Sequence, residues 1–191
     1  MEKISIASSD ALAICLEFLA AGKTLIVPTD TSYGISGDAT SPVIVRQIFE
    51  LKGRDFSKPV GIFVADLAMA KQFTQIGQEA EQLFNQYLPG PLTLVLPKKA
   101  NLPEEVGMGS TLSVRMPDQP FLLDLIKFLG RPLVNTSANL SGQTDLYDPS
   151  KCQIEADLLV DGGVLLGSKP STVYDVANHK VLRQGEITVK Q

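Results

Sequence analysis

Three basic side chains lie close together at one point of the chain. Lys52, Arg54 and Lys58 fall within seven residues, and Gly53 lets a ligand approach the backbone closely. Arginine offers a planar pair of donors and lysine a mobile point charge, a combination that suits a polyphosphate. The alternative is a solvated helix end whose cations stabilise the helix dipole. These residues alone leave both interpretations open.

A hydroxyl and an amide lie two residues apart in the segment 137–139. Residues at this spacing on a strand face the same side, so Ser137 and Asn139 together are able to hold a ribose, a base or a carboxylate. The alternative is an Asx or Ser turn, which is common where a strand ends. The segment 29–31, with Thr29, Asp30 and Thr31, is open to a ligand-binding or a simple turn interpretation as well.

Arg115 ends an otherwise apolar segment. A cation at such a place is costly unless it meets an anion or water, so its partner is either a structural carboxylate or the carboxylate of a ligand. The chain has one histidine, His179. A metal site with two histidine ligands is therefore excluded, and a Ser–His–Asp triad would need this residue. His179 stands in a predicted hairpin turn, and we interpret it as a surface residue.

These polar groups follow predicted strands and helices that alternate along the chain. Two pairs of strands lack a helix between them, which indicates a mixed α/β sheet rather than a purely parallel one. In such sheets, ligands bind where loops follow the strands, and the polar segments begin at such points. The pattern predicts strands at 24–27, 60–64, 92–96, 111–114, 132–135, 158–160, 172–176 and 181–182, and helices at about 9–22, 41–52, 78–88 and 120–129, with short helices capped by Asp66 and Ser150.

Length and composition are those of an ordinary globular protein. The 191 residues carry 17 Lys+Arg against 21 Asp+Glu, a net charge of −4, and they predict one domain over residues 1–191. The acidic balance argues against non-specific coating of nucleic acid, but a local basic pocket needs only a few residues. Cys15 and Cys152 make no disulfide framework, and we interpret Cys15 as a core residue. Without a signal sequence or an apolar run of membrane-spanning length, we expect a cytoplasmic protein.

Taken in order, these segments resemble the YrdC-like family of threonylcarbamoyl-AMP synthases, in its short single-domain form. Each motif alone is weak, but the ordered set is specific and covers the chain from about residue 24 to residue 187. The resemblance implies an open, strongly twisted mixed α/β sheet with flanking helices and a basic concave face. The matching elements are residues 28–34, Lys52 and Arg54 with Lys58, residues 89–93, Thr111 and Arg115, Ser137 and Asn139, residues 171–175, and residues 182–185.

The resemblance implies an enzyme that makes threonylcarbamoyl-AMP and pyrophosphate from L-threonine, bicarbonate and ATP. The product would supply N6-threonylcarbamoyladenosine at position 37 of tRNA through a separate TsaD-like transferase. Mg²⁺ would arrive with ATP, and no protein-bound metal is expected. The resemblance implies that Lys52 and Arg54 are catalytic. It also implies threonine contacts for Thr31, Arg115, Ser137 and Ser171, and ATP contacts for Lys52, Arg54, Lys58, Thr111, Asn139 and Arg183.

The chain departs from the family pattern at three positions. Asp55 stands where the family usually has proline, which adds a negative charge beside the expected phosphate site. Phe63 stands where many members have a histidine near threonine. Pro170 occupies a position where an acidic residue is frequent.

The alternative function is that of a non-catalytic RNA-binding protein, similar to the YciO-like group of the same family. The chain shares the run at residues 167–173 with that group. It also keeps Lys52, Arg54, Ser137 and Asn139 together, which favours the synthase.

Overall fold

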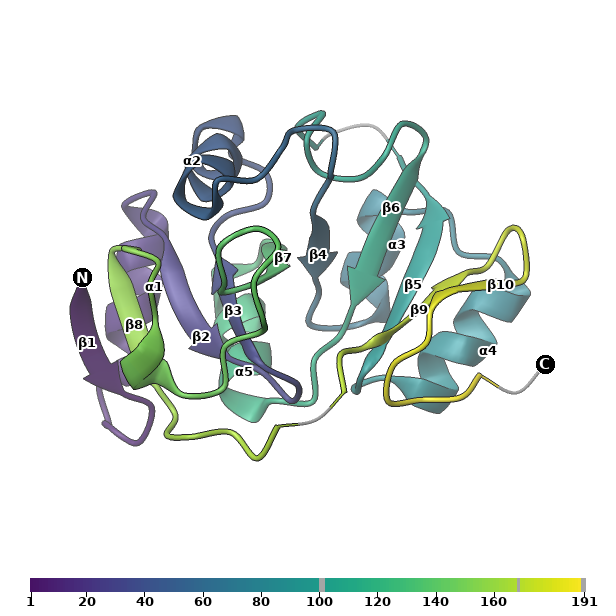
Figure 1. Cartoon of the computed structure of the whole chain (residues 1–191). Coiled ribbons are helices and arrows are strands. Elements are labelled where there is room, and N and C mark those ends of the chain that lie inside the picture. The colour runs from purple at the N-terminus through teal and green to yellow at the C-terminus, as the bar shows by residue number, and fades with distance from the viewer. Residues whose placement is uncertain (100–101, 168, 190–191) are drawn as a thin grey trace.

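Short buried runs of aliphatic residues pair into one mixed sheet (Figure 1). The computed structural model describes residues 1–99, 102–167 and 169–189. Within these ranges, ten strands lie in the order β1-β8-β2-β3-β7-β4-β6-β5-β9-β10. The strands are β1 (Glu2–Ser5), β2 (Leu25–Pro28), β3 (Tyr33–Ser36), β4 (Gly61–Phe63), β5 (Leu92–Pro97), β6 (Thr111–Arg115), β7 (Leu133–Ser137), β8 (Leu158–Asp161), β9 (Thr172–Asp175) and β10 (Lys180–Arg183).

The sheet mixes both pairing directions, as the sequence predicts. β8 pairs in parallel with β1 and β2, and β4 with β6, whereas β2–β3, β3–β7, β4–β7 and β5–β6 are antiparallel. The prediction of a mixed α/β sheet is confirmed. This pairing places β4 between β7 and β6, in the middle of the molecule, where the strand is buried on both sides.

Figure 1 shows behind the sheet the helices α1 (Ala11–Ala20), α3 (Leu67–Phe73), α4 (Gln78–Tyr87) and α5 (Pro120–Leu129), and at its upper edge α2 (Pro42–Lys52). Each helix buries apolar side chains on one side; in α5, Leu122, Leu125 and Ile126 are fully buried. No helix within the described ranges has the length and apolar character needed to cross a bilayer.

The helix α2 begins and ends where its sequence predicts. The Ser41 hydroxyl accepts a hydrogen bond from the Ile44 amide, and Pro42 occupies the first helical position. Gly53 ends the helix in the left-handed conformation, with φ of 55°, which glycine adopts without a side-chain clash. Lys52 is thereby fixed on the last turn, next to the loop that continues toward β4.

Sequence patterns miss two strands and misplace one cap. β1 is largely exposed and forms through parallel pairing with β8, so its own residues carry little apolar signal. β3 contains glycine and serine, and it is buried because β2 and β7 pair on either side of it. The helix expected after Ser150 is a short 3₁₀ turn, Pro149–Lys151, capped by the Asp148 side chain.

Cys15 is fully buried in the core, and burial raises the pKa of its thiol to about 12. A thiol with this pKa stays protonated near neutral pH, so it is not a nucleophile. The expectation that Cys15 is a core residue is confirmed.

Gly61 lies where β4 and β6 pack closely against each other. A Cβ atom at this position would lie 2.6 Å from the main-chain oxygen of Ser113 and 2.9 Å from its Cβ. Gly61→Ala is therefore expected to lower the free energy of unfolding by about 1–3 kcal/mol, measured by urea denaturation. Gly77→Ala is the control because nothing lies within 4 Å of the place that its Cβ atom would take. A Gly61→Ala variant as stable as this control would contradict the packing.

Candidate functional site

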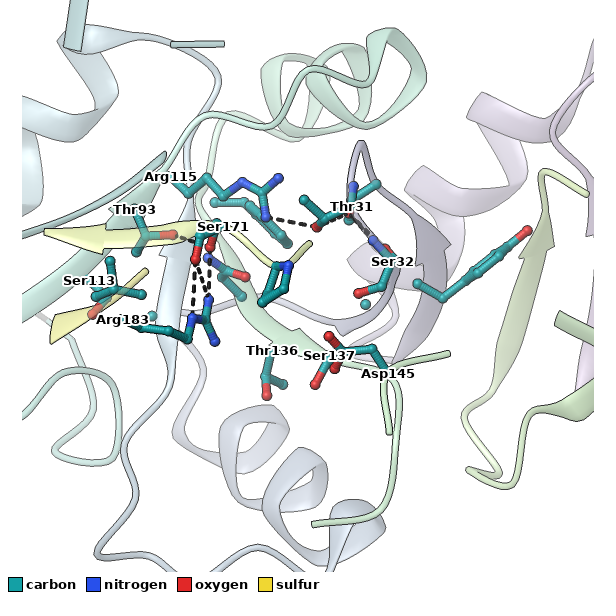
Figure 2. Close-up of a pocket in the computed structure, with 18 of the residues that line it drawn as sticks. Thr31, Ser32, Thr93, Ser113, Arg115, Thr136, Ser137, Asp145, Ser171 and Arg183 are labelled. Atoms are coloured by element: carbon teal, nitrogen blue, oxygen red, sulfur yellow. Dashed lines mark hydrogen bonds between the residues drawn. The ribbon is translucent and has the colours of Figure 1, made fainter. Parts of the chain in front are cut away.

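A cavity of about 230 Å³ opens on the sheet face over the middle strands (Figure 2). Three strands contribute residues two apart: Gly61 and Phe63 of β4, Ser113 and Arg115 of β6, and Asn135 and Ser137 of β7. Residues at this spacing share one face of a strand, so the sheet itself forms the floor. The β2–β3 loop, β5, the start of β9 and the end of β10 complete the wall with Thr31, Ser32, Thr93, Ser171 and Arg183.

Arg115 is almost completely buried at the end of β6. Its Nη2 donates to Asp30 Oδ1 at 2.6 Å, its Nη1 to Thr31 Oγ1 at 3.1 Å, and its Nε to the Gly90 carbonyl at 3.1 Å. Burial lowers the Arg115 pKa, and the Asp30 carboxylate opposes that shift. Of the two alternatives left open by the sequence, the structure provides the structural carboxylate. A guanidinium has five N–H groups, and the described residues accept from three of them, which leaves two for a ligand in the cavity that Arg115 lines.

The β2–β3 loop is organised by one hydroxyl. Thr29 Oγ1 donates to the Ser32 carbonyl at 2.7 Å and accepts from the Thr31 amide at 3.1 Å. Thr29 Oγ1 and Thr31 Oγ1 also lie 3.1 Å apart. The segment is therefore a hydroxyl-stabilised turn, and the same turn directs Thr31 and Ser32 into the cavity.

Arg183 and Ser171 meet on the other side of the cavity. Arg183 donates from Nε and Nη2 to the Ser171 carbonyl, at 3.1 and 2.8 Å, and from Nη2 to Ser171 Oγ at 3.0 Å. Ser171 Oγ lies 2.8 Å from Thr93 Oγ1. A register shift between Val181 and Arg183 interrupts the β9–β10 ladder, and such bulges re-aim side chains.

Gly185 lets the chain after β10 pack against residues 170–172, where β9 begins. A Cβ atom on Gly185 would lie 2.0 Å from the Pro170 carbonyl oxygen. The Gly185 amide donates to Thr172 Oγ1 at 3.0 Å, and the Glu186 amide donates to the Pro170 carbonyl at 3.0 Å. This close approach holds β10, and with it Arg183, against the start of β9.

Lys52 does not line this cavity. Its ammonium is buried and donates to the Ser137 carbonyl and, at 2.7 Å, to the Asn139 carbonyl. Burial lowers the Lys52 pKa from 10.5 to about 8, with the positive charge of Arg54 acting in the same direction and Asp145 opposing it. The lysine therefore fixes the chain after β7, the same chain that carries the Ser–Ala–Asn motif.

Ser137 and Asn139 bind each other as well as the loop. Ser137 Oγ donates to Asn139 Oδ1, and Asn139 Nδ2 donates to the carbonyls of Leu140 and Gln143 at 3.0 and 2.8 Å. The motif is thus a hydrogen-bonded turn. Ser137 lines the cavity described above, whereas Asn139 lines a neighbouring cavity of about 340 Å³ formed by the loop after β7.

Arg54 and Lys58, which follow Lys52 in the loop after α2, differ in their position relative to the cavity. Arg54 lines the cavity and donates to the carbonyls of Lys58 and Pro59 at 2.6 and 3.0 Å. Lys58 is exposed. Thr111 donates to the Met108 carbonyl at 3.0 Å. Neither residue lines the cavity. Their expected contacts with ATP stay predictions.

Sequence reasoning omits Thr93, Ser113, Thr136 and Asp145 from the site, although all four line the cavity. Ser113 stands two residues before Arg115 on one strand, so the period of two was sufficient to find it. Asp145 lies in an irregular loop, where the direction of a side chain does not follow from residue spacing.

The structure shows where the three residues that depart from the family pattern lie. Asp55 is exposed and accepts from the Ser57 amide at 2.8 Å, which lowers its carboxyl pKa. Phe63 is 1% exposed and forms part of the cavity floor, and Pro170 lies at the wall. His179 is exposed, as expected, and its Nδ1 lies 3.1 Å from Glu79 Oε1.

Comparisons with known proteins identify relatives over most of the chain. The family model described as "Telomere recombination", which covers the Sua5, YciO and YrdC proteins, matches residues 17–185. A putative threonylcarbamoyl-AMP synthase of Methanocaldococcus jannaschii is 34% identical over 176 residues, 89% of this chain and 83% of the relative. A threonylcarbamoyl-AMP synthase of Escherichia coli is 31% identical over 184 residues, 92% of this chain and 96% of the relative.

A solved structure agrees with these relatives. The crystal structure of Pyrococcus abyssi Sua5 complexed with L-threonine matches with a TM-score of 0.87 and 33% identity. The match covers 96% of this chain but 57% of the Pyrococcus chain. This chain therefore spans little more than half the length of that relative.

Burial of the Lys52 ammonium predicts that the stability of the fold depends on pH. Because the Lys52 pKa falls from 10.5 to about 8 on folding, the unfolded chain binds more protons than the folded chain between these pH values. Stability is therefore expected to rise with pH across this window in the wild type relative to Lys52→Met, which lacks the titrating group. Urea denaturation of both proteins at several pH values between about 7.5 and 10 measures the difference. A difference that does not change with pH would contradict the burial of a charged ammonium.

Proposed function

Because the chain belongs to the Sua5–YciO–YrdC family, we propose that it is a threonylcarbamoyl-AMP synthase. It converts L-threonine, bicarbonate and ATP into threonylcarbamoyl-AMP and pyrophosphate. The product serves the formation of N6-threonylcarbamoyladenosine at position 37 of tRNA, with a TsaD-like transferase as the next enzyme. Two named synthases that align along most of their own length support this assignment.

The observation that carries the proposal is the composition of the cavity. Arg54, Arg115 and Arg183 supply positive charge, and hydroxyl groups supply most of the other polar contacts. Its volume of about 230 Å³ fits a ligand of the size of an amino acid. Pockets for drug-sized ligands span about 300–1,000 Å³, so a nucleotide must extend beyond this cavity. A Sua5 relative with L-threonine bound supports threonine as the amino acid.

Threonine and ATP take different parts of the site in this proposal. Threonine contacts Thr31, Arg115, Ser137 and Ser171, with its carboxylate on the two remaining N–H groups of Arg115. ATP extends from Arg183 at the end of β10 toward α2 and the loop after β7. Its contacts are Lys52, Arg54, Lys58, Thr111, Asn139 and Arg183. The neighbouring cavity of about 340 Å³, which Asn139 lines, supports placing part of the nucleotide there.

The reaction has two parts. The threonine ammonium first loses a proton. The neutral amine then adds to the carbon of bicarbonate with loss of water and gives N-carboxythreonine, whose new carboxylate attacks the α-phosphorus of ATP and releases pyrophosphate. The second part is a nucleotidyl transfer, in which the protein acts mainly by positioning the reactants and stabilising charge. Arg54 is suited to this role because its own partners are neutral main-chain carbonyls, which leave its positive charge uncompensated. Lys52 holds the loop of the Ser–Ala–Asn motif in place while adding positive charge.

Mg²⁺ enters the proposal as part of the ATP substrate. Within the described residues, no group of three His, Cys, Asp or Glu side chains is arranged to hold a metal ion. Mg²⁺ commonly binds through substrate phosphates and keeps several waters, so this proposal requires no dedicated metal ligands from the protein.

The decisive measurement is pyrophosphate release from ATP by the wild-type protein. We expect release that requires threonine and bicarbonate together, and that stops when either is omitted. Salt-dependent tRNA binding without threonine-dependent pyrophosphate release would instead favour the RNA-binding alternative.

Arg54→Ala tests the assignment of positive charge to the phosphates. The variant is expected to lower the rate of pyrophosphate release by about 10- to 100-fold, because a charge that stabilises the transition state is lost. Arg46→Ala is the matched control, since Arg46 lies on the exposed side of α2 and pairs with Glu105. Equal rates in both variants, with unchanged melting temperatures, would refute the role of Arg54.

A further inference from the structure

Asp145 contributes a carboxylate to the wall of a cavity that is otherwise positive. Arg54, Arg115 and Arg183 all line this cavity. Asp30, the other nearby carboxylate, is held by Arg115 at 2.6 Å. Asp145 lines both this cavity and the neighbouring one, so it stands at the boundary between them.

The main chain that follows Asp145 is held in place. The Tyr33 amide donates to the Leu146 carbonyl at 2.8 Å, and the Leu165 amide donates to the Tyr147 carbonyl at 2.9 Å. The Leu146 side chain is buried in the core. The carboxylate is therefore presented from a fixed segment that is joined to β3, one of the strands of the central sheet.

The Asp145 carboxylate has no hydrogen-bond or ion-pair partner in the part of the chain that the structure describes. It acts at longer range on Lys52 and Arg183, and it raises the pKa of both side chains against the effect of burial. Figure 2 shows Asp145 and Arg183 on opposite sides of the cavity. Arg115 lines the same cavity, so an amino acid whose carboxylate lies on Arg115 meets positive charge at that end, and Asp145 supplies negative charge elsewhere on the wall.

This polarity fits a zwitterion. The carboxylate of an α-amino acid binds arginine, and its ammonium needs an anionic or neutral acceptor close by. In the described cavity wall, the side-chain candidates are hydroxyls, the Asn135 amide and Asp145, and a charged acceptor binds an ammonium more strongly than a neutral one. A ligand without the amine would form no ion pair with Asp145, and the Asp145 carboxylate would repel the carboxylate of that ligand.

We propose that Asp145 binds the α-ammonium of the amino-acid substrate and thereby makes the site select amino acids over the corresponding acids that lack the amine. The inference rests on the proposed function, because it takes the amino acid of that reaction as the ligand. It assigns to Asp145 a contact that the sequence motifs do not contain.

The test compares L-threonine with (R)-3-hydroxybutyrate, which is threonine without its amine. Dissociation constants for both ligands are measured by calorimetry on the wild type and on Asp145→Asn, which keeps the shape and removes the charge. We expect Asp145→Asn to bind threonine roughly tenfold or more weakly, and to bind 3-hydroxybutyrate equally well or more tightly. The opposite directions distinguish a lost ammonium contact from a damaged cavity.

Asp148→Asn is the matched control. Asp148 lies three residues further along the same loop, lines the neighbouring cavity only, and caps the 3₁₀ turn, a role that asparagine also performs. This variant is expected to bind threonine like the wild type.

Two results would overturn the assignment of Asp145. One is an unchanged threonine affinity in Asp145→Asn, and the other is an equal loss of affinity for both ligands. Failure of the proposed function is recognised separately, as a wild type that binds threonine without releasing pyrophosphate from ATP. A wild type that binds no threonine would overturn both.

Discussion

The buried guanidinium of Arg115 joins the two halves of the sheet, and the candidate site depends on it. Arg115 stands at the end of β6, and its partners Asp30 and Thr31 belong to the loop between β2 and β3. A charge this deep is costly unless ionic and hydrogen-bonded partners surround it, so the loop and the strand are held in one relative position. The cavity lies between these two elements. Removal of either partner would leave a buried charge and an unanchored wall.

A second constraint is that several cations at the site are held by neutral main-chain oxygens. Lys52 binds the carbonyls of Ser137 and Asn139, Arg54 those of Lys58 and Pro59, and Arg183 that of Ser171. A carbonyl orients a cation and satisfies its donors without cancelling its charge. Loop geometry and positive potential therefore arise from the same contacts, and this explains how a chain with a net charge of −4 contains a cavity suited to anions.

Particular residues show how far the sequence was sufficient. Ser41, Pro42 and Gly53 predicted the bounds of α2 because caps and breakers act within a few residues. The mixed sheet followed from strands without helices between them, and the structure confirms it. β1 was missed because its partner, β8, is distant in sequence, and β3 because its glycine and serine give little apolar signal of their own. Thr93 and Asp145 were missed because they reach the cavity only through pairing of β5 with β9 and anchoring of the loop after β7.

By itself, the sequence determined the class of fold, the places where polar groups follow apolar segments, and the ordered motifs that identify the family. These properties depend on residue type and local spacing. Only the tertiary structure decided that Arg115 pairs with Asp30, that the Lys52 ammonium binds two carbonyls beside the cavity, and that Asp145 stands opposite Arg183. Each of these depends on segments far apart in the chain. Burial makes these contacts necessary, because a charge removed from water must be satisfied by the groups that the fold places around it.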